Sequence, residues 1–235
     1  MRECERLLSN ALCDRQGRLI LLPIPTTRDN IYITGTDRSL KSILPLLSSD
    51  TCLCGYGIPY LLTEGARGAG AFVFDASECE SFLLENARLT AKGALGYILT
   101  NFPRDISKMN IGIVGYGRIG REMLRLCLLL GGRLTVYTTR ESVAIELCEA
   151  GVPCRVIDNL TDFSTLDLLI NTAPARQIDE EKLPDNLSII DLASGNIFEP
   201  SAKLTKLSSV PDSFYPVTAG GLYAQAIIKA LEGRR

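Results

Sequence analysis

The stretch KMNIGIVGYGRIGREMLRLCLLLGG, residues 108–132, decides the fold. Residues 111–114 form a short apolar run rich in β-branched side chains, which is typical of a parallel strand covered on both faces. Residues 115–120 then match G-x-G-x-x-G, the dinucleotide-binding fingerprint. A helix is predicted over residues 118–130 and a second strand over residues 133–137. This order of strand, glycine turn, helix and strand is the context that the fingerprint requires.

Each glycine of this loop has a separate physical task. Gly115 permits the tight turn, Gly117 lets the backbone approach a pyrophosphate, and Gly120 lets the helix pack closely on the strand. The helix would direct its free N–H groups and the positive end of its dipole at that pyrophosphate. The alternative is a structural turn that binds nothing, and the flanking strands and helix favour the nucleotide. The predicted cofactor-binding residues of the loop are Gly115, Tyr116, Gly117, Arg118, Ile119 and Gly120.

The end of the second strand indicates which nicotinamide cofactor is bound. NAD sites usually carry an acidic residue there, which holds the ribose 2′-hydroxyl. Here Thr139 and Arg140 stand at that place and the first acidic residue is Glu141. The hydroxyls of Thr138 and Thr139 and the guanidinium of Arg140 suit a 2′-phosphate, so we favour NADP. The alternative is that Arg140 is solvated and Glu141 binds the ribose of NAD.

The whole chain predicts an α/β protein of two lobes. The first ninety or so residues alternate strands and helices, one helix at Asp37–Leu47, and this order is typical of a small parallel sheet. We expect an N-terminal α/β lobe with a linking helix over residues 1–100. A Rossmann doubly wound parallel sheet is expected over residues 101–217, with a brief helix at Ala202–Leu207. Residues 218–235 predict a C-terminal helix that packs back on the N-terminal lobe.

Composition excludes several other classes of protein. The 235 residues are 46% apolar and 22% charged, which predicts a packed core rather than disorder. A formal charge of −2 argues against a nucleic-acid partner, and no apolar run reaches the ~18 residues of a membrane span. The charged start, Met1–Arg6, argues against export, so a cytoplasmic protein is expected. Its eight cysteines are scattered and there is no histidine, which favours reduced thiols over a zinc site.

The first predicted strand is Arg18–Ile24, and residues 25–30 form a polar loop at its carboxyl end. Ligands of open α/β sheets lie outside the carboxyl ends of the strands. Thr26, Thr27 and Arg28 are therefore candidate substrate-binding residues, the alternative being an ordinary polar turn.

Seven segments together resemble the A-subunit family of dipicolinate synthase, Rossmann proteins related to the NAD domains of adenosylhomocysteinase and D-2-hydroxyacid dehydrogenases. They match by order and spacing over most of the chain, and the glycine loop is the most specific of them. The family's first β-α unit has no counterpart, so the N-terminal lobe is expected to be truncated. The segments are LLPIPTTRDN (21–30), LTAKGALGYIL (89–99), IGIVGYGRIGREM (111–123), TVYTTR (135–140), LDLLINTAPA (166–175), LSIIDLASG (187–195) and PVTAGG (216–221).

The resemblance implies oxidation of a dihydrodipicolinate-level intermediate to pyridine-2,6-dicarboxylate, with NADP as hydride acceptor. It also implies, in spore-formers, a flavoprotein-like second subunit, and it leaves a homo-oligomer open. By the same resemblance Thr90 faces the cleft, and the nicotinamide ribose is bordered by Asn171, Thr172, Ala173 and Pro174.

The sequence departs from the family where substrate would bind. The family's T-x-E-G is Thr90–Gly93 here, with Lys92 in place of the carboxylate. After Ser194 the family continues with Arg-Pro-Gly-Gly, whereas this chain continues with residues 195–197, Gly-Asn-Ile. Without histidine, the His–carboxylate pair of a D-2-hydroxyacid dehydrogenase cannot exist. Lys92 is a candidate base if it is desolvated, the alternative being a surface lysine. A dicarboxylate substrate would need hydroxyls and cations, for which the candidates are Thr27, Arg28, Arg88 and Arg176.

These departures keep two further functions open besides the enzyme. One is a catalytically divergent module or subunit that binds a nucleotide without turnover. The other is a scaffold protein whose glycine loop is purely structural.

Overall fold

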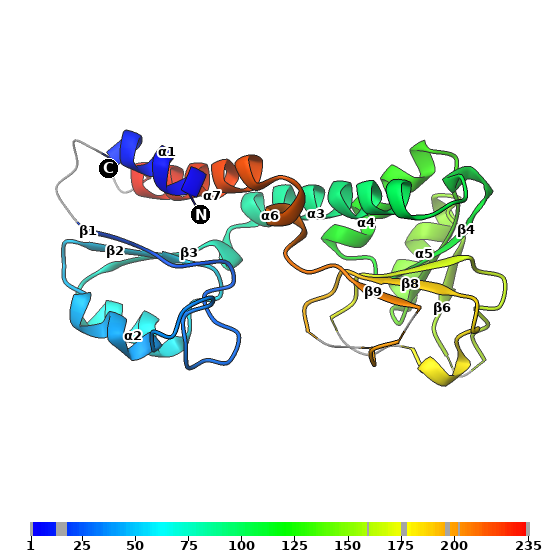
Figure 1. Cartoon of the computed structure of the whole chain (residues 1–235), viewed down its shortest axis with the longest axis horizontal. Coiled ribbons are helices and arrows are strands. Elements are labelled where there is room, and N and C mark those ends of the chain that lie inside the picture. Colours follow the sequence, from blue (N-terminus) through cyan, green and yellow to red (C-terminus); the bar gives the residue numbers. More distant parts are fainter. Residues whose placement is uncertain are drawn as a thin grey trace. The chain divides into compact units, whose positions relative to one another are not determined.

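The computed structural model describes residues 2–12, 18–158, 160–174, 178–195, 198–201 and 203–233 (Figure 1). The fold is mixed α/β with two parallel sheets, as the sequence predicts. Contacts divide the chain into unit 1, Met1–Asn86 with Pro216–Arg235, and unit 2, Ala87–Tyr215. The first boundary lies inside helix α3 (Glu80–Asn101), whereas the sequence predicts it after residue 100.

Unit 1 is built on a three-stranded parallel sheet with strand order β1-β2-β3. The strands are β1 (Arg18–Leu21), β2 (Thr51–Gly55) and β3 (Phe72–Asp75), connected through the 3₁₀ helix η1 (Leu40–Leu46) and helix α2 (Tyr60–Gly68). The helix predicted from Asp37 is wrong in type and start. It begins after Ser39, whose hydroxyl accepts a hydrogen bond from the Lys41 N–H, and Pro45 inside it has no N–H for an α-helical bond.

The first and last helices of the chain pack together in unit 1. Helices α1 (Arg2–Leu12) and α7 (Pro216–Glu232) lie side by side above the sheet (Figure 1). Gly220 permits this approach, because a Cβ there would lie 3.0 Å from Glu3 Cβ and 3.1 Å from Cys4 N. Leu8, Phe82 and Tyr223 fill the core beneath them.

Unit 2 contains a six-stranded parallel sheet with the order β6-β5-β4-β7-β8-β9. The chain reverses its direction of growth between β4 and β7, which is the switch point of a doubly wound sheet. The brief helix predicted at residues 202–207 is wrong, because residues 204–206 form the edge strand β9. The strands are β4 (Asn110–Val114), β5 (Arg133–Thr138), β6 (Cys154–Val156), β7 (Leu168–Asn171), β8 (Ser188–Asp191) and β9 (Leu204–Lys206).

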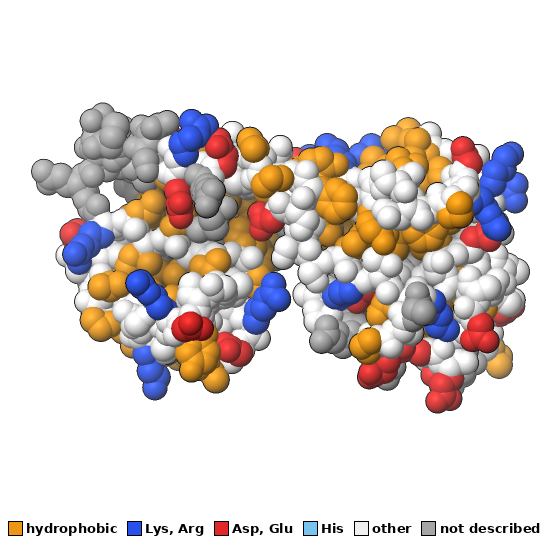
Figure 2. Space-filling model, viewed as in Figure 1, with side chains coloured by type: hydrophobic (Ala, Val, Ile, Leu, Met, Phe, Trp, Pro, Cys, Tyr) orange, Lys and Arg blue, Asp and Glu red, His pale blue; other side chains and the backbone are white. Residues whose placement is uncertain are grey.

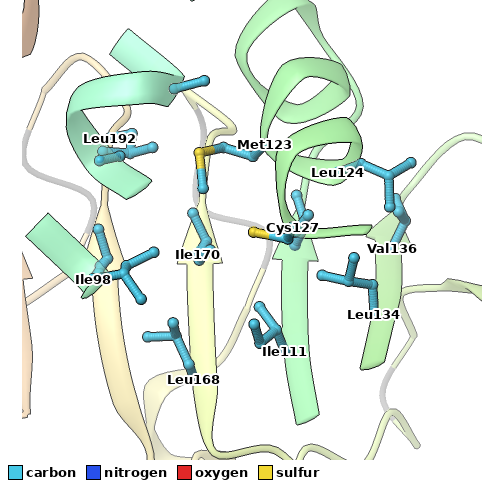
Figure 3. Packing of buried hydrophobic residues seen from close by; sticks show 14 of the residues in the cluster. Ile98, Ile111, Met123, Leu124, Cys127, Leu134, Val136, Leu168, Ile170 and Leu192 are labelled. Carbon is cyan, nitrogen blue, oxygen red and sulfur yellow. The ribbon is translucent and has the colours of Figure 1, made fainter. Parts of the chain in front are cut away.

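One face of this sheet is covered by α3 and α4 (Arg118–Leu129), with α5 (Glu141–Glu149) following β5. Figure 3 shows Ile98 of α3 and Met123 and Cys127 of α4 above Ile111 and Ile170 of the strands. All five are at most 1% exposed, and burying a side chain of this size is worth about 1.5–3 kcal/mol. A second cluster, which includes Tyr137, Phe163 and Leu169, is built from the same sheet and the connections beside it.

Replacing either of two glycines of α3 by alanine should change the stability of the protein in opposite directions. A Cβ at Gly93 would lie 2.4 Å from Val210 Cγ1 and 3.2 Å from the Phe214 ring of helix α6 (Val210–Phe214), whereas a Cβ at Gly96 meets nothing within 4 Å. Gly96→Ala should therefore stabilise the protein by about 0.5–1 kcal/mol through helix propensity. Gly93→Ala should destabilise it by about 1–3 kcal/mol through overpacking. Chemical denaturation of both variants measures the difference, and equal effects would contradict the packing of α6 on α3.

Charged side chains of both signs share the face drawn in Figure 2 with exposed apolar side chains.

All seven cysteines among the described residues are free thiols, and Cys13 lies outside these residues. Burial raises the pKa of Cys54 and Cys127 to about 12. Within the described ranges no helix is long and apolar enough to cross a membrane, and no three potential metal-ligating side chains are grouped.

Candidate functional site

The three fingerprint glycines have distinct local geometries. Gly115 has φ +90°, a left-handed conformation that L side chains rarely adopt. A Cβ on Gly120 would lie 2.3 Å from the Gly115 carbonyl oxygen, so glycine is needed for α4 to start this close to β4. A Cβ on Gly117 would meet nothing within 4 Å. The loop therefore needs two of its glycines in order to fold, while Gly117 leaves open space beside the backbone.

Helix α4 begins directly at this loop. Gly117 is its N-cap and supplies no side-chain hydrogen bond, and Arg118 is its exposed first residue. The Arg121 guanidinium lies 4.5 Å from the centre of the Tyr116 ring and 3.7 Å from the Glu146 carboxylate of α5. The Tyr116 ring thus packs on Arg121 of α4 and supports the loop, in which Gly117 and Arg118 are exposed.

The end of β5 presents both residues considered for cofactor selection. The buried Thr138 hydroxyl accepts a hydrogen bond from Arg140 N, at 3.2 Å, and so fixes the turn into α5. Thr139, Arg140 and Glu141 are all exposed. Their side chains are accessible at the place where a ribose hydroxyl or a 2′-phosphate would be bound in a sheet of this kind.

The end of β7 lies against the glycine loop, at the switch point. Thr172 Oγ1 donates to the Val114 carbonyl, at 2.9 Å, and Thr172 N donates to the same oxygen. A Cβ on Gly115 would lie 3.2 Å from Ala173 N. Two predicted groups of cofactor residues, 115–120 and 171–174, are therefore neighbours in unit 2.

Asn171 is 2% exposed, and its side chain is used inside the protein. Its amide nitrogen donates to Asp191 Oδ1 at 2.8 Å and to the Ala173 carbonyl at 3.2 Å, and its Oδ1 accepts from Ala173 N. Asn171 therefore shapes the loop at the end of β7 through hydrogen bonds within the protein.

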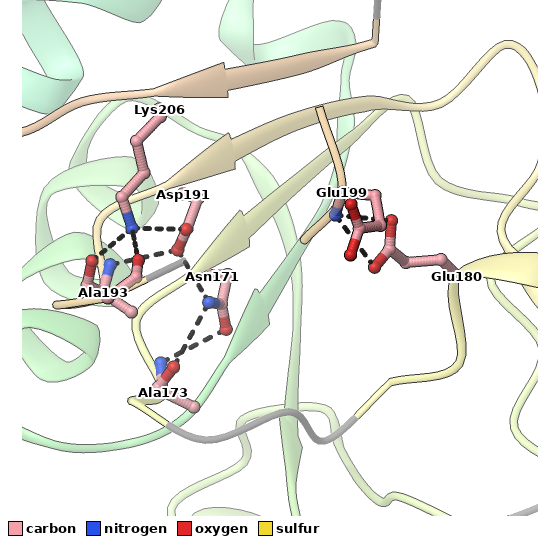
Figure 4. A network of polar contacts seen from close by, with 8 residues as sticks. Asn171, Ala173, Glu180, Asp191, Ala193, Glu199 and Lys206 are labelled. Atoms are coloured by element: carbon pink, nitrogen blue, oxygen red, sulfur yellow. Dashed lines mark hydrogen bonds and ion pairs between the residues drawn. The ribbon is translucent and has the colours of Figure 1, made fainter. Parts of the chain in front are cut away.

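A polar network that the sequence analysis missed crosses the ends of β7, β8 and β9 (Figure 4). Lys206 Nζ lies 2.6 Å from Asp191 Oδ2 and 2.5 Å from the carbonyl oxygens of Ala193 and Gly195. Asp191 is 1% exposed and also accepts from Asn171 and from Ala193 N. The only sequence signal is an acidic residue at the end of a strand that is otherwise apolar, since the local pattern around Lys206 favours a helix.

The predicted substrate residues of unit 1 differ in what they can contact. Thr26 is fully buried, and its hydroxyl accepts from Tyr56 N at 3.0 Å, so it ties two loops together. The Thr27 hydroxyl donates to Asp29 Oδ1, at 3.1 Å. Hydrogen bonds from the backbone N–H groups of Tyr32 and Ile31 lower the pKa of Asp29. Of the three predicted residues, only Arg28 borders the open depression of about 280 Å³, which Asp29 and residues 32–37 also line.

The candidates on α3 lie in different surroundings. Lys92 is exposed, as in the alternative of a surface lysine, so its role as a base stays a prediction without the desolvation on which it depends. Thr90 is 7% exposed. The Arg88 guanidinium lies 3.6 Å from the Glu122 carboxylate, and Arg176 lies outside the described residues.

No family profile and no curated protein matches this chain by sequence. Among solved structures it is similar to the dipicolinate synthase A chain from Bacillus subtilis (TM-score 0.74, 20% identity, 94% of this chain and 80% of that one). It is also similar to the corresponding dipicolinate synthase chain from Bacillus halodurans (TM-score 0.74, 20% identity, 91% and 79%) and to a transhydrogenase from Sinorhizobium meliloti (TM-score 0.63, 16% identity, 82% and 71%). The resemblance drawn from the motifs is thus confirmed in the fold.

Proposed function

We propose that this chain is an NADP-dependent oxidoreductase of the dipicolinate synthase type. The observation that carries the proposal is the glycine loop at the switch point, where Gly117 leaves open space beside the first turn of α4. A pyrophosphate fits there, because backbone N–H groups and the helix dipole favour an anion. The similarity of the fold to a dipicolinate synthase chain and to a transhydrogenase supports the same class of protein.

The proposed reaction removes a hydride and a proton from a dihydrodipicolinate-level ring, which becomes aromatic, and the proton passes to water. When bound, NADP supplies the hydride acceptor. The protein binds the pyrophosphate through the backbone of residues 115–120, and the loop of residues 171–174 beside it orients the second half of the cofactor. Arg28, exposed at the depression of unit 1, is the proposed cation for a substrate carboxylate.

Thr139 and Arg140 favour NADP over NAD. Both are exposed at the start of α5, and a guanidinium binds a phosphate through two parallel hydrogen bonds. We expect Arg140→Ala to weaken NADPH binding about 10- to 30-fold, as loss of charged hydrogen bonds does, while NADH binding changes less than about twofold. Titration followed by nicotinamide fluorescence measures both affinities.

Arg133→Ala is the matched control for this experiment. Arg133 is exposed at the opposite end of the same strand, β5, so its substitution removes an equal charge away from the proposed phosphate. Equal weakening by both substitutions would show a general charge effect and contradict the assignment of Arg140. If the wild-type protein binds neither nucleotide, the enzyme and the nucleotide-binding module both fail, and the scaffold remains.

The exposure of Lys92 favours a second candidate, a module that binds nucleotide without turnover. Formation of NADPH from NADP in the presence of dihydrodipicolinate, followed by its absorbance, separates the two. Turnover supports the enzyme. Tight NADPH binding without turnover of this substrate supports the module.

A further inference from the structure

We infer that Lys206 is a positioning residue for the nicotinamide half of the nucleotide site, an inference that rests on the proposed function. Lys206 is the last residue of the edge strand β9 and its side chain is 27% exposed. Its carboxylate partner Asp191 is the last residue of β8 and is almost fully buried. The pair therefore stands at the carboxyl ends of the strands, which is the ligand-binding edge of such a sheet.

The Lys206 ammonium has no N–H left for a substrate. It carries three donors and accepts none. The structure gives it three acceptors, which are Asp191 Oδ2 and the carbonyl oxygens of Ala193 and Gly195. Binding a substrate carboxylate directly would require one of these bonds to break. Lys206 therefore acts through the groups that it holds.

What it holds is the turn that follows β8. Gly195 lies in this turn with φ +95°, and two of the turn's carbonyls are bonded to one ammonium. Asp191 extends the same network to the next strand, because its Oδ1 accepts from Asn171 of β7 and from Ala193 N. A single cation thus fixes the ends of β8 and β9 and, through Asp191, the loop beside the glycine turn (Figure 4).

The position of the network on the sheet identifies the half of the nucleotide that it affects. A doubly wound sheet binds one mononucleotide on each side of its switch point. The β4-β5-β6 side carries Thr139 and Arg140, which are proposed to bind the adenosine 2′-phosphate. The β7-β8-β9 side, where Lys206 lies, is left for the nicotinamide mononucleotide.

Two ligands separate this role from a general effect on the fold. NADPH spans both halves of the site, whereas adenosine 2′,5′-bisphosphate occupies only the adenosine half. In the full-length protein, we expect Lys206→Met to weaken NADPH binding about tenfold and to leave adenosine 2′,5′-bisphosphate binding within about twofold. The nicotinamide emission maximum of bound NADPH should also shift, because the ring is held less firmly.

Lys203→Met is the matched control, since Lys203 immediately precedes β9, at the end of this strand opposite to Lys206. The Lys203 ammonium lies 3.4 Å and 3.5 Å from the carbonyl oxygens of Leu183 and Pro184, away from Asp191. It should change neither affinity. Lys206→Arg keeps the charge beside Asp191, but a planar guanidinium cannot direct donors as the ammonium does. Its NADPH affinity should lie between those of the wild type and Lys206→Met, and it provides the same comparison if Lys206→Met does not fold.

Equal weakening of both ligands in the Lys206 variants, or no weakening of NADPH, would overturn the inference and leave the proposed function intact. Failure of the wild-type protein to bind either ligand would instead overturn the proposed function, and this inference with it.

Discussion

Gly117→Ala is expected to weaken NADPH binding by at least about 100-fold, the equivalent of roughly 3 kcal/mol, without a comparable loss of stability. Gly117 has φ −85° and ψ −163°, which alanine adopts without strain, and its Cβ would enter open space. The folded protein should therefore tolerate the substitution. A pyrophosphate that must approach this backbone would meet the added methyl group. Nicotinamide fluorescence titration and thermal unfolding of the same sample test both parts.

Two other glycines serve as controls for Gly117→Ala. Gly68, at the end of α2 in unit 1, also has open space where a Cβ would stand, so Gly68→Ala should leave NADPH binding unchanged. Gly120→Ala would place its Cβ 2.3 Å from the Gly115 carbonyl oxygen and should lower stability as well as binding. Wild-type NADPH affinity in Gly117→Ala would remove the observation on which the proposed function rests.

Asp191→Ala is expected to destabilise the protein by about 3 kcal/mol, which lowers Tm by roughly 6–12 °C for a chain of this size. The substitution removes the acceptor of Asn171, of Ala193 N and of Lys206 in one step. A loss of about 3 kcal/mol is the lower end of the range of about 3–5 kcal/mol for removing one partner of a buried ion pair. We expect the lower end because Lys206 keeps partial access to water. Differential scanning calorimetry measures the change.

Asp185→Ala removes the same side chain from an exposed turn shortly before β8 and should shift Tm by less than about 2 °C. A similarly small shift for Asp191→Ala would show that the network at the ends of β7, β8 and β9 contributes little to stability. The stability of Asp191→Ala has to be known before its nucleotide affinity is interpreted.

The sequence predicts most of the strands of both units from their short apolar runs, which are fully buried in β7 and nearly so in β4. It fails where local propensity does not decide the structure. β9 has only three residues, and it is a strand because its backbone pairs with β8. The segment after Asp37 has helical spacing, but an α-helix there would bring the Pro45 ring against the carbonyl of Lys41, and the segment is a 3₁₀ helix.

The same distinction applies to the candidate site. The glycine loop is local in sequence, so its turn, its close helix packing and its open position could be derived from six residues. The contact of Lys206 with Asp191 joins residues on different strands, and only the register of β8 with β9 brings them together. The hydrogen bond that the Thr26 hydroxyl accepts likewise comes from Tyr56, thirty residues away in the chain.

The packing of α1 on α7 has a consequence for the order in which unit 1 forms during synthesis. Residues 87–215 of unit 2 are continuous in sequence, so all of its strands have been synthesised before α7 begins. Residues 1–86 of unit 1 are synthesised before unit 2, yet the core of unit 1 also contains Tyr223 and Ile227 from α7. A nascent chain that has reached residue 215 therefore holds every described strand of both sheets, but the apolar faces of α1 and of the first sheet are not yet covered by α7.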